Sequence, residues 1–91
     1  MIYIILGNGF EEAEAVIPCD LLRRAGLSVR FAGIGGTEIT GGHGITVRAE
    51  CVAEQTDFSD AEMIVLPGGL GGVASIRGCK PVLDALRGQY E

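Results

Sequence analysis

Three carboxylates follow the first apolar run of the chain and are the first candidates for chemistry. Glu11, Glu12 and Glu14 fall at the start of a segment with helical spacing. Acidic side chains in a first helical turn commonly serve only to complement the helix dipole. At about 100° per residue, however, Glu14 lies on a different face from Glu12. A Glu14 carboxyl turned toward a sheet edge would be partly desolvated, which favours its protonated form, so it could act as a general acid or hydrogen-bond to a thiolate.

A glycine-rich loop after a later apolar run is the second candidate. Residues 67–72 include Gly68 and Gly69, whose backbone N–H groups could face a developing oxyanion. The spacing Gly69-x-Gly71-x-x-Ala74 also matches a dinucleotide-binding fingerprint, although a chain with 15 glycines gives such matches by chance. The glutamates across the crevice would repel a pyrophosphate. The ordinary alternative is a tight turn that needs glycine backbone angles.

The cysteines and the single histidine give weaker signals. Cys19, Cys51 and Cys79 are odd in number and lack C-x-x-C spacing, which argues against a disulfide framework or a zinc site. We expect Cys19 in the core and Cys51 to be partly buried. Cys79 precedes a helix start, where the dipole and Lys80 would stabilise a thiolate, but no base stands beside it. His43 has no partner cluster in the sequence, so we expect a hairpin residue rather than a metal ligand.

The composition is that of one globular domain. The chain has 91 residues, 47% of them hydrophobic and 21% charged, with a net charge of −5. This acidic balance argues against nucleic acid as a partner. No apolar run approaches the roughly 18 residues of a membrane span. Residues 2–6 are too short and lack the basic flank of a signal peptide, so we expect a cytoplasmic protein.

A strand–helix–strand unit positions the first candidate loop. Residues 2–6 form a continuous apolar run, typical of a strand buried on both faces of a parallel sheet. Residues 11–25 have helical spacing, with Pro18 either kinking one helix or starting a second, and Gly26 is a stop signal. Residues 28–32 form the next strand, so the order predicts a parallel βαβ unit.

The remaining pattern adds a hairpin, a strand and a helix. The hairpin joins residues 37–40 to 45–49 and is appended to the parallel sheet. Residues 55–60 are polar and loop-like, residues 63–66 form another buried strand, and a helix runs from residue 82 to about 89. In open α/β sheets ligands bind beyond the carboxyl ends of the strands, where both candidate loops lie.

The predicted elements make an incomplete α/β fold. Three apolar strands need helices on both faces, yet only two helices are predicted. A final helix should also feed a further strand. We therefore expect the N-terminal half of a larger fold, whose other half is cleaved off, supplied as a separate chain or absent.

Three segments, in order and at matching spacing, resemble the DJ-one (ThiJ/PfpI) superfamily. The runs G-F-E-E-A-E-A-V-I-P at residues 9–18 and D-L-L-R-R-A-G at 20–26 resemble its first helix. The run G-H-G-I at residues 42–45 resembles its S-H-G-[IV] hairpin segment, with Gly42 in place of Ser. The run I-V-L-P-G-G at residues 64–69 resembles its strand and turn. Within this superfamily, the chain looks most like the small bacterial members labelled thiazole monophosphate biosynthesis proteins.

The resemblance implies a flavodoxin-like, doubly wound, mostly parallel sheet with the hairpin appended, usually as a homodimer. The family's reactive centre is a cysteine in an A-I-C-x-G elbow, above a glutamate that donates a hydrogen bond to the thiolate. By position Glu14 matches this glutamate, and Gly68 and Gly69 match the backbone pair beside the cysteine. Arg24 and His43 fall where family members place residues near the dimer interface. The resemblance implies no metal or organic cofactor.

The chain departs from the family at the reactive centre. Residues 1–91 contain no A-I-C-x-G elbow and lack the family's downstream histidine. We therefore expect the N-terminal part of a single ThiJ/PfpI-type domain, which depends on the C-terminal half for its nucleophile. The implied chemistry of the complete assembly is cysteine-dependent glyoxalase, deglycase or hydrolase action on small carbonyl compounds. The alternatives are stress or oxidation sensing, a non-catalytic binding or chaperone-like module, and a nucleotide-binding half-fold.

Overall fold

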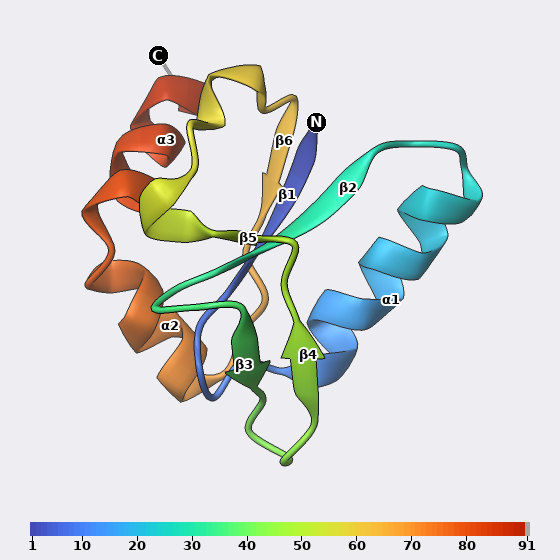
Figure 1. The fold of residues 1–91 in the computed structure, drawn as a ribbon, viewed down its shortest axis with the longest axis vertical. Helices are drawn as coiled ribbons and strands as arrows, with labels where there is room; N and C mark the ends of the chain where they lie inside the picture. The colour runs from blue at the N-terminus through green and yellow to red at the C-terminus, as the bar shows by residue number, and fades with distance from the viewer. Residues whose placement is uncertain (91) are drawn as a thin grey trace.

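A four-stranded parallel sheet lies between two helical layers in the computed structural model, which describes residues 1–90 and the side chains of 1–88 (Figure 1). The strands are β1 (Ile2–Leu6), β2 (Val29–Gly33), β5 (Cys51–Val52) and β6 (Met63–Val65). Their order across the sheet is β5-β2-β1-β6, and every neighbouring pair is parallel. The predicted α/β class and parallel sheet are confirmed, although β5 was not predicted.

The βαβ unit forms as its residues predict. Helix α1 (Glu12–Arg24) joins β1 to β2, whose register runs from Ile2 opposite Val29 to Leu6 opposite Gly33. The helix continues through Pro18, so the alternative of two separate helices is wrong. It ends where Gly26 takes a φ of 83°, with its N–H donating to the Arg23 carbonyl at 3.0 Å. Only glycine adopts that angle without strain, which is why it stops the helix here.

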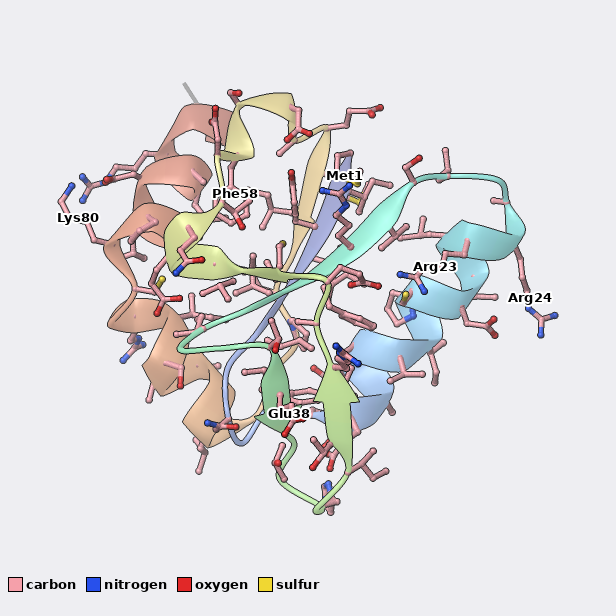
Figure 2. The ribbon with its side chains drawn as sticks, in the orientation of Figure 1. Met1, Arg23, Arg24, Glu38, Phe58 and Lys80 are labelled. Carbon is pink, nitrogen blue, oxygen red and sulfur yellow. The ribbon has the colours of Figure 1, made fainter. Side chains whose placement is uncertain are left out.

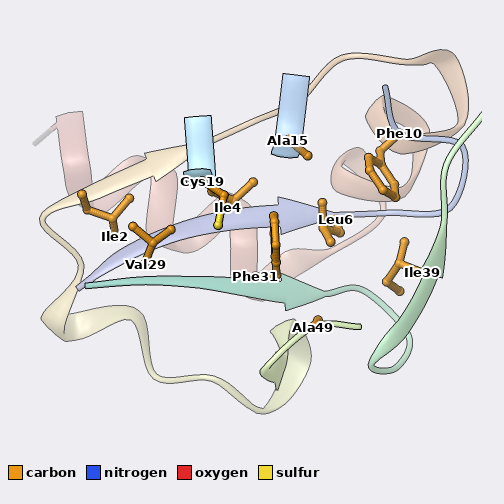
Figure 3. Packing of buried hydrophobic residues seen from close by; sticks show 10 residues of the cluster. All are labelled: Ile2, Ile4, Leu6, Phe10, Ala15, Cys19, Val29, Phe31, Ile39 and Ala49. Carbon is orange, nitrogen blue, oxygen red and sulfur yellow. The ribbon is translucent and has the colours of Figure 1, made fainter. Parts of the chain in front are cut away.

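Both faces of β1 are buried, each in its own apolar layer. Ile2, Ile4 and Leu6 pack toward α1, where Figure 3 shows Ala15 and Cys19 of the helix with Ile4 and Phe31. The alternate residues of β1 join the cluster on the opposite face, with Ile76, Cys79 and Val82. Because side chains alternate along a strand, an unbroken apolar run indicates burial on both faces.

Three α-helices cover the sheet rather than the two predicted. Helices α2 (Leu70–Arg77) and α3 (Lys80–Tyr90) lie on the face opposite α1 (Figure 1). We expected a glycine-rich loop where α2 begins, because Gly71 and Gly72 have low helix propensity. They are needed there because a Cβ at Gly72 would lie 2.9 Å from the Cα of Phe10. Tertiary contact thus overrides local propensity.

Residues 55–60, predicted as a loop, include the end of one short 3-10 turn, at Ala53–Gln55, and all of a second, at Phe58–Asp60. The phenol of Tyr3 donates to Asp60 at 2.7 Å, which ties the second turn to β1. None of the described helices is both long and apolar enough to cross a membrane.

The hairpin is built as predicted but attached differently. Strands β3 (Glu38–Thr40) and β4 (Thr46–Arg48) pair antiparallel and form a separate two-stranded sheet. It is held by the loop after β1, where the Gly9 N–H donates to the Thr40 carbonyl at 2.8 Å and the Thr40 N–H to Asn8 Oδ1 at 2.9 Å. The hairpin therefore covers the carboxyl end of β1 without extending the parallel sheet.

Strand β6 is less buried than its sequence predicts. Met63 is 47% exposed, and the rest of the strand is half-buried. The reason is topological, because β6 pairs with β1 alone among the described strands. Leu66 and Leu70 beyond it are 44% and 94% exposed, so an apolar surface continues from this edge onto α2.

Candidate functional site

The two candidate loops meet at the carboxyl ends of β1 and β6. The Glu11 N–H donates to the Gly68 carbonyl at 2.9 Å. Gly69 has a φ of 95°, and a Cβ there would lie 2.4 Å from the Gly9 carbonyl oxygen. A Cβ at Gly9 would in turn lie 2.8 Å from the Cα of Gly71. The glycine spacing that resembles a dinucleotide fingerprint is therefore explained by contact between two backbones.

Glu14 is joined to this junction by one hydrogen bond. Its Oε1 accepts from the Gly68 N–H at 2.7 Å, while Oε2 has no partner among the described residues. The side chain is exposed, so the predicted desolvation of Glu14 is wrong for the chain as described. The reason is that no described element covers the carboxyl, which lies at the open end of the sheet.

The bond to Glu14 also changes what the two glycines can do. We expected both N–H groups to be available to an oxyanion, but that of Gly68 is already donated to the carboxylate. The Gly69 N–H has no acceptor among the described residues, while its carbonyl accepts from Val73 at 2.9 Å and so begins α2. The Gly68 N–H therefore holds the Glu14 carboxylate, and of the two glycines only Gly69 has an N–H without an acceptor among the described residues.

Glu12 is the buried carboxylate of the first turn, at 6% exposure. Its Oε2 accepts from the His43 N–H at 2.8 Å and the Ile45 N–H at 3.3 Å, and its Oε1 lies 3.1 Å from His43 Nδ1. Burial opposes ionisation, but hydrogen bonds from its own backbone and from His43 and Ile45 outweigh burial and lower the pKa of Glu12 to about 2. Glu12 is thus an ionised anchor for the hairpin.

His43 lies at the hairpin turn, as predicted, with its side chain 74% exposed. The hydrogen bond to Glu12, then the charges of Glu12 and Glu11, raise the pKa of His43 above its usual 6.5. The expectation that His43 has no partner cluster is wrong, because Glu11 Oε2 also lies 3.9 Å from Nδ1. No local spacing could reveal this, since the fold joins positions about thirty residues apart.

The cysteines lie away from the two loops. Cys19 and Cys79 are 4% and 3% exposed, which confirms Cys19 as a core residue and removes the accessibility that a reactive Cys79 thiolate would need. Cys51 is half-buried, as predicted, with its Sγ donating to the Phe31 carbonyl at 3.6 Å. The described structure therefore brings no thiol to Glu14.

Two arginines end α1 in different environments. Figure 2 shows Arg24 projecting outward and Arg23 turned toward the sheet. Arg24 pairs with Asp20 at 3.1 Å, whereas Arg23 donates to Glu50 at 2.6 Å and to the Val29 carbonyl at 3.0 Å. Arg24, which we expected near a dimer interface, thus pairs within its own helix.

Similarity to known proteins agrees with this architecture. The sequence profile of the DJ-1/PfpI family matches residues 1–91. Protein dj-1beta of Drosophila melanogaster is 37% identical over 87 residues, which are 94% of this chain and 46% of that protein. Deglycase TK1284 of Thermococcus kodakarensis is 32% identical over 68 residues, covering 75% of this chain and 41% of the relative.

A solved structure extends the similarity to the fold. The crystal structure of Drosophila melanogaster DJ-1beta superposes with a TM-score of 0.90 at 35% identity, over 97% of this chain and 48% of that one. The chain therefore spans about half the length of the relatives that it matches. With the family profile matching from residue 1 to residue 91, the chain belongs to the DJ-1/PfpI family.

Proposed function

We propose that this chain is the N-terminal half of a DJ-1/PfpI-type domain that carries out cysteine-dependent chemistry on small carbonyl compounds, of the glyoxalase or deglycase type. The observation that carries the proposal is the contact between Glu14 and the Gly68 N–H at the meeting point of two strand ends. The similarity to a protein named as a deglycase supports the reaction class.

Each of the three residues has a role in this proposal. Once the other half of the fold covers Glu14 and shields its carboxyl from water, Oε2 would donate a hydrogen bond to a thiolate supplied by that half. Gly68 would hold that carboxyl in place through its N–H. Attack of the thiolate on an aldehyde carbon forms a C–S bond and leaves an alkoxide. The unengaged Gly69 N–H would stabilise this alkoxide.

The proposal requires the remaining half of the fold, on the same or on a second polypeptide. The apolar surface at the β6 edge supports this, because Met63, Leu66 and Leu70 are exposed there. A half-fold that packed against this surface would cover it and bring its cysteine to the carboxyl ends of the strands.

A second copy of the chain is the other partner that we propose. Val16, Ile17 and Leu21 of α1 are 43%, 57% and 60% exposed, and Ile45 of the hairpin is 56% exposed. A homodimer through this face would bury all four. An Ile17→Asp substitution should then halve the mass measured by sedimentation, and an unchanged mass would contradict the proposed dimer.

The cytoplasmic location expected from the sequence stays a prediction.

The first experiment is a denaturing intact-mass measurement followed by an activity assay. A second polypeptide, or a longer chain, that carries a further cysteine is the expected result, and the assembly should consume methylglyoxal. A single 9.5 kDa species without activity would contradict the proposal that this protein takes part in cysteine-dependent catalysis. Glu14→Ala should abolish most turnover, and wild-type turnover in this variant would contradict the assignment of Glu14.

The choice of control variant follows from the structure. Glu12 is an unsuitable control, because its substitution would release the hairpin and impair activity indirectly. Glu38→Ala is better matched, because Glu38 is an exposed carboxylate on β3. Its activity should equal that of the wild type.

A further inference from the structure

A mixed group of potential metal ligands lies where α1 meets the hairpin turn. Glu11, Glu12 and His43 each offer one ligand atom, and these atoms all lie within 4.8 Å of one another. The Glu14–Gly68 contact does not use any of these three side chains. We propose that they form a binding site for a divalent transition cation of the zinc type.

The distances between donor atoms are close to those of a tetrahedral site. Ligands about 2.0–2.1 Å from a zinc ion in tetrahedral geometry are about 3.3 Å apart. His43 Nδ1 lies 3.1 Å from Glu12 Oε1 and 3.9 Å from Glu11 Oε2. Only Glu11 has to move closer, and its Oε2 can serve as the ligand while Oε1 accepts from the Ala13 N–H at 3.3 Å.

The carboxylate of Glu12 is held in place for this role. Its Oε2 accepts from two backbone N–H groups, which leaves Oε1 directed at the imidazole. Outer hydrogen bonds of this kind orient a ligand and strengthen metal binding. A buried ligand that is already fixed loses little conformational entropy when a cation binds.

The surroundings leave room for further ligands. A hollow of about 470 Å³ adjoins the cluster and is also lined by Ala13, Val16, Ile17 and Ile45. Water or an added anion could take the fourth coordination position from this side. The two carboxylates carry two negative charges, which exceed the half charge of about +0.5 at the helix N-terminus. The cluster therefore attracts a cation despite its place in the first turn.

The test is a titration of the purified chain with Zn²⁺ by calorimetry and with Co²⁺ by visible absorption. We expect one cation per chain with a dissociation constant of about 1 μM, and no thiolate charge-transfer band. His43→Ala and Glu11→Gln should each weaken binding at least about 10-fold, because even the loss of an outer-shell partner of a ligand costs about 10- to 100-fold. Both side chains are more exposed than Glu12, which is left intact because it anchors the hairpin.

The control is Glu14→Gln, which alters a carboxylate of the same helical turn outside the cluster and should bind Zn²⁺ as the wild type does. Repeating the titration with Leu21→Asp keeps the site accessible if a second copy covers α1, because Leu21 is exposed on the same helix and does not line the hollow. Equal affinity in His43→Ala and wild type would overturn the proposal. So would a cobalt–thiolate band, or the absence of binding up to about 1 mM Zn²⁺.

Discussion

The contact between the two loops predicts a large effect of Gly69→Ala on stability. Gly69 has a φ of 95°, and an added Cβ would lie 2.4 Å from the Gly9 carbonyl oxygen and 2.9 Å from the Glu11 nitrogen. Both obstructing atoms belong to backbone, so no side chain can rotate away to relieve the overlap. The loops would have to separate, which would also disturb the bond between Gly68 and Glu14.

The magnitude follows from two separate contributions. A left-handed backbone angle costs a residue with a Cβ about 1–2 kcal/mol. Overpacking at a close contact adds about 1–3 kcal/mol. We therefore expect Gly69→Ala to reduce the free energy of unfolding by about 2–5 kcal/mol, a large part of the total for a chain of this size.

Two other glycines provide matched controls. Gly35 has a φ of 84° with nothing within 4 Å of an added Cβ, so Gly35→Ala should show only the backbone contribution of about 1–2 kcal/mol. Gly88 lies in α3 without a positive φ, and its added Cβ also meets nothing. Gly88→Ala should stabilise the chain by about 0.5–1 kcal/mol through helix propensity.

Urea unfolding followed by far-UV circular dichroism measures all three variants against the wild type. The expected order of stability is Gly88→Ala, wild type, Gly35→Ala, then Gly69→Ala. If Gly69→Ala and Gly35→Ala unfold at the same urea concentration, the two loops are not in contact. The placement of Glu14 against Gly68 would then lose its structural basis.

Three further predictions test the core and the hairpin anchor. Phe10→Ala removes a ring that is 1% exposed and should lower the free energy of unfolding by about 3–5 kcal/mol in urea; a loss under about 1 kcal/mol would contradict its burial. Burial, then the hydrogen bond to Asp60, raises the pKa of Tyr3 from 10.0 to about 12. The contribution of protonated Tyr3 to the free energy of unfolding is therefore complete below pH 10 and lost as pH rises through 12, with a loss of about 1 kcal/mol at pH 11. Tyr3→Phe should remove this pH dependence of the free energy of unfolding, and an unchanged dependence would exclude Tyr3 as its source. Glu12→Ala should accelerate amide exchange of His43, measured by NMR, more than Glu12→Gln, which keeps an acceptor oxygen; equal rates would show that the carboxylate is not the acceptor.

The carboxylates of the first turn show where sequence reasoning reaches its limit. Helical geometry correctly separates the faces of Glu12 and Glu14, but it cannot say which face is covered. Glu12 is buried because the hairpin, about thirty residues away in the chain, returns over it and donates His43 and Ile45 N–H groups. Glu14 accepts a hydrogen bond from the Gly68 N–H at the carboxyl end of the sheet, yet its side chain stays exposed there.

The glycines of the second loop show the same limit. Gly69 and Gly71 were open to interpretation as a tight turn or as a nucleotide fingerprint, because either use requires glycine. The deciding contact is with Gly9, on a loop some sixty residues earlier. Helix α2 was missed for a related reason, since its glycines lower helix propensity but allow Phe10 to pack closely.

The sequence by itself determined the elements whose signals are local. The apolar run of β1, the helical spacing and glycine stop of α1 and the βαβ order are set by side-chain periodicity and backbone preferences, and the structure confirms each. Only the tertiary structure decided which carboxylate is buried, which glycine N–H is engaged and that His43 meets Glu11 and Glu12. These features depend on backbones that are distant in the chain and meet at one end of the sheet, and no pattern within a single segment records such a meeting.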